Sequence, residues 1–302
     1  MVAALTLALT GATGFVGAHL LDLALAEGHA VRALTRRPQS ARDGVTWIAG
    51  ALEDPAALAT LCAGADAVIH VAGVINADAA GFEAGNVAGT SAMLSAAEQA
   101  GVERFVHVSS LAAREPALSL YGASKARSEA LMVASPMSSA IVRPPAVYGP
   151  GDRETLELFA MAKRGLVLLP PAGKLSLIHV DDLARLLLTL AASKAAVLVE
   201  PDDGRPGGWT HAEFGHALGR AMGRKVRTIS TPAPLLRLAA RADRLVRGDK
   251  AKLTPDRAAY FCHSDWTVSP ARAAPAGLWH ARIDTEQGLA ATARWYEAQR
   301  WL

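Results

Sequence analysis

A tyrosine and a lysine stand four residues apart, at Tyr121 and Lys125, in a stretch with a helical pattern. On a helix this spacing places both side chains on one face, one turn apart. A free tyrosine has a pKa of ~10, so it needs a neighbouring cation before it exchanges protons readily near neutrality. Lys125 would supply that positive field and would also be able to hold a ribose. The pair predicts an acid–base site, although the same spacing is common by chance on helices.

Two serines, Ser109 and Ser110, follow an apolar run that ends at Val108. In open parallel sheets, ligands bind at the carboxyl ends of the strands. A hydroxyl group at that place can donate a hydrogen bond to a carbonyl oxygen. A glycine-rich turn, a serine and a Tyr-x-x-x-Lys pair in this order form a far more specific signal than the pair alone.

The glycine-rich turn covers residues 10–17, TGATGFVG, between the first apolar run and the first helical pattern. Its first glycine allows a sharp turn, its second lets the backbone approach a pyrophosphate, and its third lets the helix pack closely on the sheet. The first amides of the helix would point at the anion from its positive end. The predicted cofactor contacts are Gly11, Thr13, Gly14, Phe15, Val16 and Gly17. This strand–turn–helix context predicts a dinucleotide site rather than a turn without a ligand.

The second apolar run ends in Leu34, Thr35, Arg36 and Arg37, without the acidic residue that commonly binds the ribose hydroxyls of NAD. A guanidinium group pairs well with a 2′-phosphate. Arg36 and Arg37 therefore favour NADP over NAD. The alternative is that both arginines lie on a solvated loop and bind nothing.

Apolar runs of strand length alternate with helical patterns through the first half of the chain. The predicted strands cover residues 5–9, 30–34, 45–48, 67–71, 104–108 and 139–142. The predicted helices cover residues 15–26, 55–61, 89–100 and 122–132. Continuously apolar strands separated by helices indicate βαβ units, hence a parallel sheet covered on both faces. The fold class is predicted to be α/β, a doubly wound Rossmann sheet.

The pattern becomes irregular after Pro150. A strand at 175–180 and a helix at 182–192 repeat the earlier alternation of strand and helix and are expected to return to the first domain. Residues 201–208 are expected to form a loop. The rest is mostly helical. We therefore predict an NADP-binding domain at 1–150 plus 175–198, and a smaller, mostly helical substrate lobe at 151–174 and 199–302.

Composition excludes several classes of protein. The 302 residues are 51% hydrophobic and 20% charged, with a mean hydropathy of +0.19, which excludes a disordered chain. A net charge of +3 does not indicate nucleic-acid binding. Cys62 and Cys262 lie far apart without further metal-ligand spacing, so we expect no disulfide and no metal. We expect a cytoplasmic protein, because the apolar N-terminus has no basic flank and no apolar run would span a bilayer.

Residues 234–247 form an amphipathic pattern. Its apolar side chains fall within one arc of about 120° on a helical wheel: Leu235, Leu238, Ala239, Ala242, Leu245 and Val246. Opposite them lie Arg237, Arg241, Arg244 and Arg247. Residues 232–252 hold six basic and two acidic residues. One interpretation is a helix that packs its apolar face on the small lobe; the other is a helix that rests on anionic lipid at the inner face of a membrane.

These motifs resemble the extended short-chain dehydrogenase/reductase family, and the resemblance covers nearly the whole chain. It is closest to the branch of ketoreductases, 3β-hydroxysteroid dehydrogenases and dihydroflavonol reductases. Beyond the turn and the Tyr–Lys pair, the matching segments are HVAG at 70–73, NVAGT at 86–90, RPPAVYGPG at 143–151, IHVDD at 178–182 and the final residues Trp295, Tyr296, Trp301 and Leu302.

The resemblance implies roles for particular residues. Tyr121 would be the general acid/base, Lys125 its partner, and Ser110, rather than Ser109, the serine that binds the carbonyl. Further cofactor contacts would be Leu52, Ala72, Pro144 and Val147. The chain departs from the family where Gly50-Ala51-Leu52 lacks the aspartate that often reads adenine. It also lacks the Thr-Asp-Glu of the sugar-nucleotide dehydratases, so dehydration is not expected.

The function predicted from the sequence is NADPH-dependent reduction of a hydrophobic ketone to a secondary alcohol. A 3-keto sphingolipid, a steroid-like ketone and smaller carbonyl compounds all remain as substrates. The alternatives are a nucleotide-sugar epimerase, which would retain NAD, and a non-catalytic NADP-binding subunit. The expected partners are a small hydrophobic molecule and a membrane surface touched by residues 234–247; a homodimer fits the family, and nucleic acid is not expected.

Overall fold

The computed structural model describes residues 3–248, 251 and 253–302, so Met1, Val2, Asp249, Lys250 and Lys252 of the predicted segments lie outside the described residues. The chain forms two compact units. The first holds the residues up to Pro144 together with Asp181–Glu200 and Arg272–Trp279. The second holds Pro145–Val180, Pro201–Ala271 and His280–Leu302. These units differ from the predicted domains in four segments. Residues 145–150 and 175–180, predicted in the first domain, belong to the second unit, and residues 199–200 and 272–279, predicted in the substrate lobe, belong to the first.

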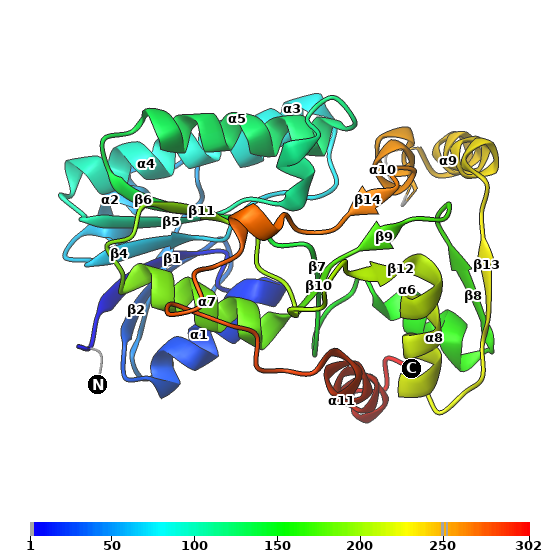
Figure 1. Ribbon diagram of the computed structural model, residues 1–302. Helices are drawn as coiled ribbons and strands as arrows, with labels where there is room; N and C mark the ends of the chain where they lie inside the picture. Colours follow the sequence, from blue (N-terminus) through cyan, green and yellow to red (C-terminus); the bar gives the residue numbers. More distant parts are fainter. Residues whose placement is uncertain (1–2, 249–250, 252) are drawn as a thin grey trace. The chain divides into compact units, whose positions relative to one another are not determined.

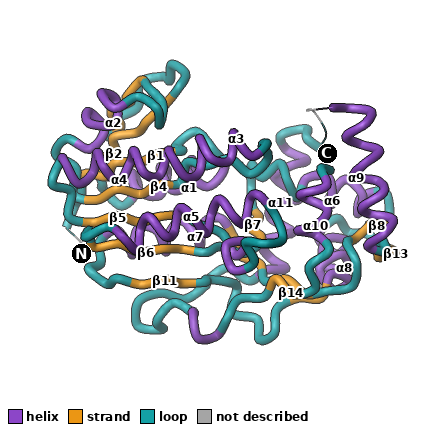
Figure 2. Tube along the Cα trace, turned by 90° about the horizontal axis from the view of Figure 1, so that it is seen from above, coloured by secondary structure: helices purple, strands orange, loops and turns teal. Residues whose placement is uncertain are grey.

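A seven-stranded sheet forms the centre of the first unit, in the order β11-β6-β5-β4-β1-β2-β3, and every pair is parallel. Figure 2 shows these strands side by side. Their bounds are β1 Thr6–Thr10, β2 Ala30–Thr35, β3 Val45–Ala49, β4 Ala67–His70, β5 Arg104–Val108, β6 Ser138–Val142 and β11 Val197–Val199. The strand order reverses between β1 and β4, which is where this class of sheet binds its ligands. The predicted Rossmann fold is confirmed.

Helices cover both faces of this sheet, with α4 and α5 on one face and α1 and α7 on the other (Figure 1). The longer helices are α1 Phe15–Ala26, α2 Pro55–Cys62, α4 Gly89–Gln99, α5 Leu120–Ala134 and α7 Val180–Ala191, and the short ones are α3 Ala79–Phe82, the π-helix η1 Glu83–Ala88 and the 3₁₀-helix η2 Leu111–Arg114. Because both faces are covered, every residue of β4 and β5 is buried.

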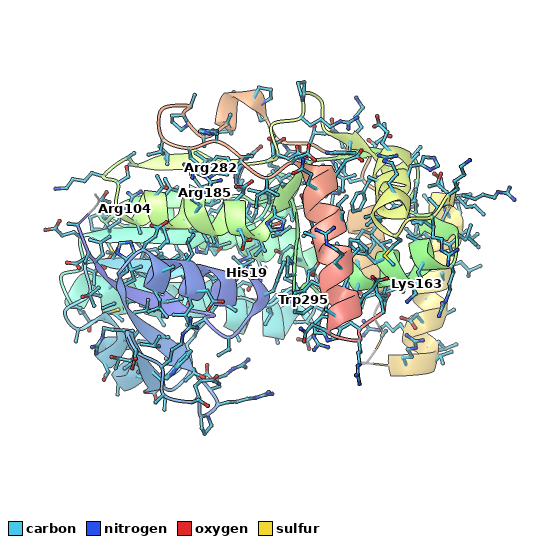
Figure 3. All side chains as sticks on the ribbon, turned by 90° about the horizontal axis from the view of Figure 1, so that it is seen from below. His19, Arg104, Lys163, Arg185, Arg282 and Trp295 are labelled. Atoms are coloured by element: carbon cyan, nitrogen blue, oxygen red, sulfur yellow. The ribbon has the colours of Figure 1, made fainter. Side chains whose placement is uncertain are left out.

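Polar side chains fix the ends of these elements. Asp54 accepts from two amides at the start of α2, and Ser119 accepts from the amide of Gly122 at 2.9 Å at the start of α5. Arg104, labelled in Figure 3, is buried at the start of β5 and donates to the carbonyl of Leu190 at the end of α7, at 2.9 Å. This hydrogen bond connects α7 to the sheet, and the helix predicted at 182–192 therefore lies in the first unit, as expected.

The second unit is built from small sheets and helices around a core that includes Tyr148, Phe159, Trp209 and Tyr296. Its strands are β7 Ala146–Tyr148, β8 Leu166–Leu169, β9 Lys174–Leu175, β10 Leu177–His179, β12 Trp209–Thr210, β13 Arg227–Ser230 and β14 Asp265–Trp266. Its helices are α6 Leu156–Lys163, α8 His211–Ala221, α9 Ala233–Arg247, α10 Pro255–Phe261 and α11 Thr285–Ala298, and the short turn η4 Pro270–Arg272 joins the two units.

One predicted strand has a different partner. The segment 175–180 was expected to return to the first domain, but it belongs to the second unit, where β10 pairs in parallel with β7 in a sheet of two strands. The expectation was wrong because a run of three apolar residues fits any buried sheet, and its partner is chosen by the tertiary structure. Within the described residues, no helix is long and apolar enough to cross a membrane.

Candidate active site

The glycine turn lies at the point where the strand order reverses. Gly11 has a φ of +76°, and a Cβ atom there would lie 2.8 Å from the backbone nitrogen of Ala72, which follows β4. A Cβ atom on Gly17 would lie 2.0 Å from the carbonyl oxygen of Gly11. Glycine is therefore required at both positions, at the first for the turn and at the second for the close packing of α1.

The amino end of α1 is open to an anion. Helix α1 begins at Phe15, and its N-cap, Gly14, has no side chain to satisfy the first amides. Thr13 and Gly14 are exposed, while Phe15 and Val16 are half-buried. The positive end of the helix and the bare glycine backbone fit the pyrophosphate of a dinucleotide.

The segment after β2 carries the predicted 2′-phosphate contacts. The hydroxyl of Thr35 donates to the carbonyl of Arg37 at 2.7 Å and turns the chain at the end of the strand, so that Arg36 and Arg37 are exposed. A cavity of about 420 Å³ borders Thr13, and its basic lining residue is Arg42, which pairs with Asp22 at 2.7 Å. Sequence reasoning missed Arg42, because only the fold brings it beside the turn.

The remaining predicted cofactor contacts lie on separate segments. The amide of Ala72 donates to the hydroxyl of Thr10 at 3.2 Å, and the carbonyl of Pro144 accepts from the amide of Leu111 at 3.1 Å. Leu52 is half-buried against α4, and Val147 lies in β7 of the second unit. The structure leaves their roles as predictions.

Ser110, Tyr121 and Lys125 lie together at the carboxyl end of β5. Ser110 follows the strand and caps η2, where its hydroxyl accepts from the amide of Ala112, and Tyr121 lies in the first turn of α5. Lys125 lies one turn further along α5, and its Nζ atom donates to the carbonyl oxygen of Val108 at 3.0 Å. The predicted trio is therefore assembled within one unit, at the end of β5, which β4 separates from β1 and its glycine turn.

Burial sets the protonation of the pair. Burial raises the pKa of Tyr121 above its usual value, and the hydrogen bond with Ser110 opposes this rise. Burial also lowers the pKa of Lys125 to about 8, against the charge of Glu129, which raises it. At neutral pH the phenol therefore keeps its proton, and Lys125 is mostly charged. We expected Lys125 to lower the pKa of Tyr121, but that pKa is raised, because burial outweighs the contribution of Ser110.

Asn86 joins the loop after β4 to the helix that carries the pair. Its amide group accepts from the nitrogen of Val74 at 2.8 Å and donates to the hydroxyl of Ser124 at 2.9 Å. A Cβ atom on Gly73 would lie 2.9 Å from the side-chain oxygen of Asn86 and 3.2 Å from Nζ of Lys125. The loop thus passes directly over Lys125, which gives the HVAG and NVAGT segments a physical role that their sequence alone does not reveal.

Two buried histidines lie behind the site. His70 is held between the hydroxyls of Thr10 at 2.8 Å and Thr90 at 3.2 Å, and its ring stacks on that of His107. Burial and the charge of Lys125 lower the pKa of His70 to about 3 and that of His107 well below its usual value. Both rings are neutral, as suits a structural role. Among the described residues, no group of three or more His, Cys, Asp or Glu side chains has the geometry to hold a metal ion.

A buried carboxylate, which sequence reasoning missed, anchors α5. Glu129 accepts from the hydroxyl of Ser109 at 2.5 Å and binds Arg143 through both oxygens, at 2.8 and 2.6 Å. Arg143 also pairs with Glu200 at 3.3 Å, and Arg114 binds the other oxygen of Glu200 at the same distance. The sequence signals for this network are the position of Glu129, one helical turn beyond Lys125, and Arg143 at the start of the segment RPPAVYGPG.

Three comparisons relate this site and fold to known proteins. The model of the NAD-dependent epimerase/dehydratase family matches residues 7–200. A ceramide reductase of Caulobacter vibrioides is 41% identical over 308 residues, which cover 98% of this chain and 95% of that protein. A 4-hydroxy-2-methyl-3-oxo-4-farnesyl-3,4-dihydroquinoline-1-oxide ketoreductase of Stigmatella aurantiaca is 34% identical over 168 residues, 47% of this chain and 50% of that protein.

The solved structure of MoeE5 in complex with UDP-glucose and NAD superposes with a TM-score of 0.76, at 23% identity, over 98% of this chain and 99% of that one. This likeness shows the fold. With a glycine turn, a Tyr–Lys pair and a Rossmann sheet, the site is that of a nucleotide-dependent oxidoreductase or epimerase acting on CH–OH and C=O groups. The chain belongs to the NAD-dependent epimerase/dehydratase family of extended short-chain dehydrogenases/reductases.

The buried ion pair generates a prediction about stability. Replacing Glu129 with Gln should lower the free energy of unfolding by about 3 kcal/mol, because Arg143 loses the charge that compensates its burial. The matched control is Glu83→Gln, which breaks an exposed pair with Arg127, a residue of α5. This change should lower the free energy of unfolding by less than about 1 kcal/mol. Urea unfolding of the two variants gives both values. Equal effects would show that the buried network does not anchor α5.

Proposed function

We propose that the protein reduces a long-chain ketone of the 3-keto sphingolipid type to the secondary alcohol, with NADPH as the reductant. The main support is that Ser110, Tyr121 and Lys125 lie together at the carboxyl end of β5, with the phenol of Tyr121 protonated and Nζ of Lys125 held by the carbonyl of Val108. These are the groups that a carbonyl needs in order to be oriented, polarised and protonated.

When bound, NADPH supplies the hydride that reaches the carbonyl carbon. The hydroxyl of Ser110 donates to the carbonyl oxygen and fixes its position. The phenol of Tyr121, protonated because burial raises its pKa, delivers its proton to that oxygen as negative charge develops there. The ammonium group of Lys125, held by the carbonyl of Val108, stabilises the resulting phenolate.

The ceramide reductase supports the lipid substrate, because its similarity extends over 98% of this chain and so includes the second unit. The ketoreductase with a farnesyl substrate is a further relative whose name describes a lipophilic ketone. The absence of acidic residues beside Ser110, where the sequence reads Ser109-Ser110-Leu111, disfavours dehydration of a nucleotide sugar. We assign the second unit, without its β7 and β10 sheet, to substrate binding.

Removing the proton donor tests the catalytic assignment. Tyr121→Phe should reduce turnover by about a hundredfold or more, since proton transfer by a positioned acid contributes about that factor. NADPH binding, measured by fluorescence titration, should be unchanged because the ring remains. Turnover within a factor of ten of the wild type would contradict the role of Tyr121.

Removing the two arginines after β2 tests the choice of cofactor. Arg36→Ala combined with Arg37→Ala should weaken NADPH binding by about ten- to a hundredfold and leave NADH binding nearly unchanged, as expected for lost arginine–phosphate contacts. Arg42→Ala is the matched control, because Arg42 is already paired with Asp22. Equal losses for both cofactors would refute a 2′-phosphate contact, and a selective loss in the control alone would move it to Arg42.

A nucleotide-sugar epimerase is the second candidate, favoured by the likeness to a fold that binds UDP-glucose and NAD in MoeE5. An epimerase retains its NAD through the reaction, whereas a reductase exchanges NADP. Mass spectrometry of the nucleotide carried by the purified protein separates the two. A non-catalytic NADP-binding subunit would carry NADP and turn over no ketone.

A further inference from the structure

Helix α9 does not pack its apolar face on the second unit, so this interpretation of residues 234–247 is wrong. Its packed stripe consists of buried Ala240 together with half-buried Ala233, Leu236 and Asp243. The larger apolar side chains are solvent-exposed, at 55% for Leu235, 62% for Leu238, 89% for Leu245 and 82% for Val246. The stripe of larger apolar side chains therefore faces outward, and the side of the helix centred on Ala240 is the packed one.

The arginines form a second exposed stripe on the same helix. Arg237, Arg241, Arg244 and Arg247 are all exposed, and on a helix of 3.6 residues per turn they lie on the side away from the leucines. Arg247 also pairs with Asp243 at 3.2 Å. In Figure 1, α9 lies at the edge of the second unit, where β13 leads into it.

The strands before α9 continue this pattern. Leu166, Leu168 and Ile229 are exposed on β8 and β13, and Leu168 pairs with Ile229. Basic residues flank these strands: Lys163 and Arg164 at the end of α6, and Arg224, Lys225 and Arg227 at the start of β13 are all exposed. Between β13 and α9 the amide of Thr231 donates to the carbonyl of Leu169 at 2.9 Å, so the strand pair and the helix are directly linked.

Positive charge is concentrated in the part of the chain that runs from α8 through β13 to the end of α9. Residues 214–247 contain eight basic residues and one acidic residue, whereas the whole chain carries a net charge of +3. The remainder of the chain is therefore net acidic. A surface that combines exposed leucines with arginines complements an anionic lipid headgroup layer, with the leucines in the acyl boundary and the long guanidinium side chains at the phosphates.

We propose that α9, with the exposed side of β8 and β13, docks on an anionic membrane surface. The basic residues around this surface favour an anionic lipid layer over a second copy of the chain, because the second copy would present an equally basic surface. The docking goes beyond the proposed function, and it would place a reductase of lipid ketones at the surface where its substrate resides.

Flotation with vesicles tests the docking without any enzymatic readout. The wild type should float with vesicles of phosphatidylglycerol and phosphatidylcholine at low salt, and at least tenfold less with phosphatidylcholine alone. Binding should be lost as salt rises, since the screening length falls from ~30 Å at 0.01 M to ~3 Å at 1 M. Absence of flotation at low salt, or equal flotation with both vesicles, would overturn the proposal.

Two variants divide the surface into its parts. Changing Leu238, Leu245 and Val246 to Gln removes the apolar stripe, and changing Arg237, Arg241, Arg244 and Arg247 to Gln removes the charges. Each set should reduce vesicle binding at least tenfold while NADPH binding and circular dichroism stay unchanged. The control is Val133→Gln, an apolar side chain of α5 that is 77% exposed and should not affect flotation.

Sedimentation velocity without lipid tests the rival occupant. A dimer that the apolar-stripe variant abolishes would show that a second copy covers α9, and would overturn membrane docking. Because flotation needs neither substrate nor turnover, a protein that floats but reduces no ketone would contradict the proposed function and leave the docking intact. The reverse result would leave the reductase and remove the docking.

Discussion

The ion pair between Glu129 and Arg143 joins the helix of the candidate site to the strands beneath it. Glu129 lies on α5, Arg143 follows β6, and Ser109, which donates to Glu129, follows β5. Glu200, which follows β11, binds the far side of the same guanidinium. Charges this deeply buried cost several kcal/mol to desolvate, so they are retained only where partners satisfy them fully. The position of α5, and with it the spacing of the reacting groups, depends on this network.

The same network balances charge around the predicted acid–base pair. Burial alone would favour a neutral Lys125, but the carboxylate of Glu129 raises the pKa of that lysine and holds it at about 8. His70 and His107 stay neutral beneath the site, because burial, and after it the charge of Lys125, lowers the pKa of each ring. One cation close to one protonated phenol is the arrangement that carbonyl reduction requires.

Local patterns explain what the sequence could predict. The parallel sheet is predicted by the apolar runs, and the dinucleotide turn by the spacing of its glycines. Tyr121 and Lys125 were found because they lie on one helix, four residues apart. The contacts of Arg143 with Glu129 and Glu200 were missed because the three residues come from distant segments, and no local pattern signals a contact across the sheet. The side by which α9 packs was also missed. Helical periodicity separates an apolar face from a charged face, but it does not show that the packed side is the one that carries the small residue Ala240.

Transfer of deuterium from the reductant to the lipid is the direct test of ketone reduction by this protein. The purified protein would be incubated with NADPH carrying deuterium at the reactive position and with a 3-keto sphingolipid, and the lipid product would be analysed by mass spectrometry. A ketone reductase should give a secondary alcohol with one deuterium on the former carbonyl carbon, formed in step with NADP. An unlabelled lipid and unconsumed NADPH, beside a protein that turns over a nucleotide sugar with its own retained NAD, would contradict it.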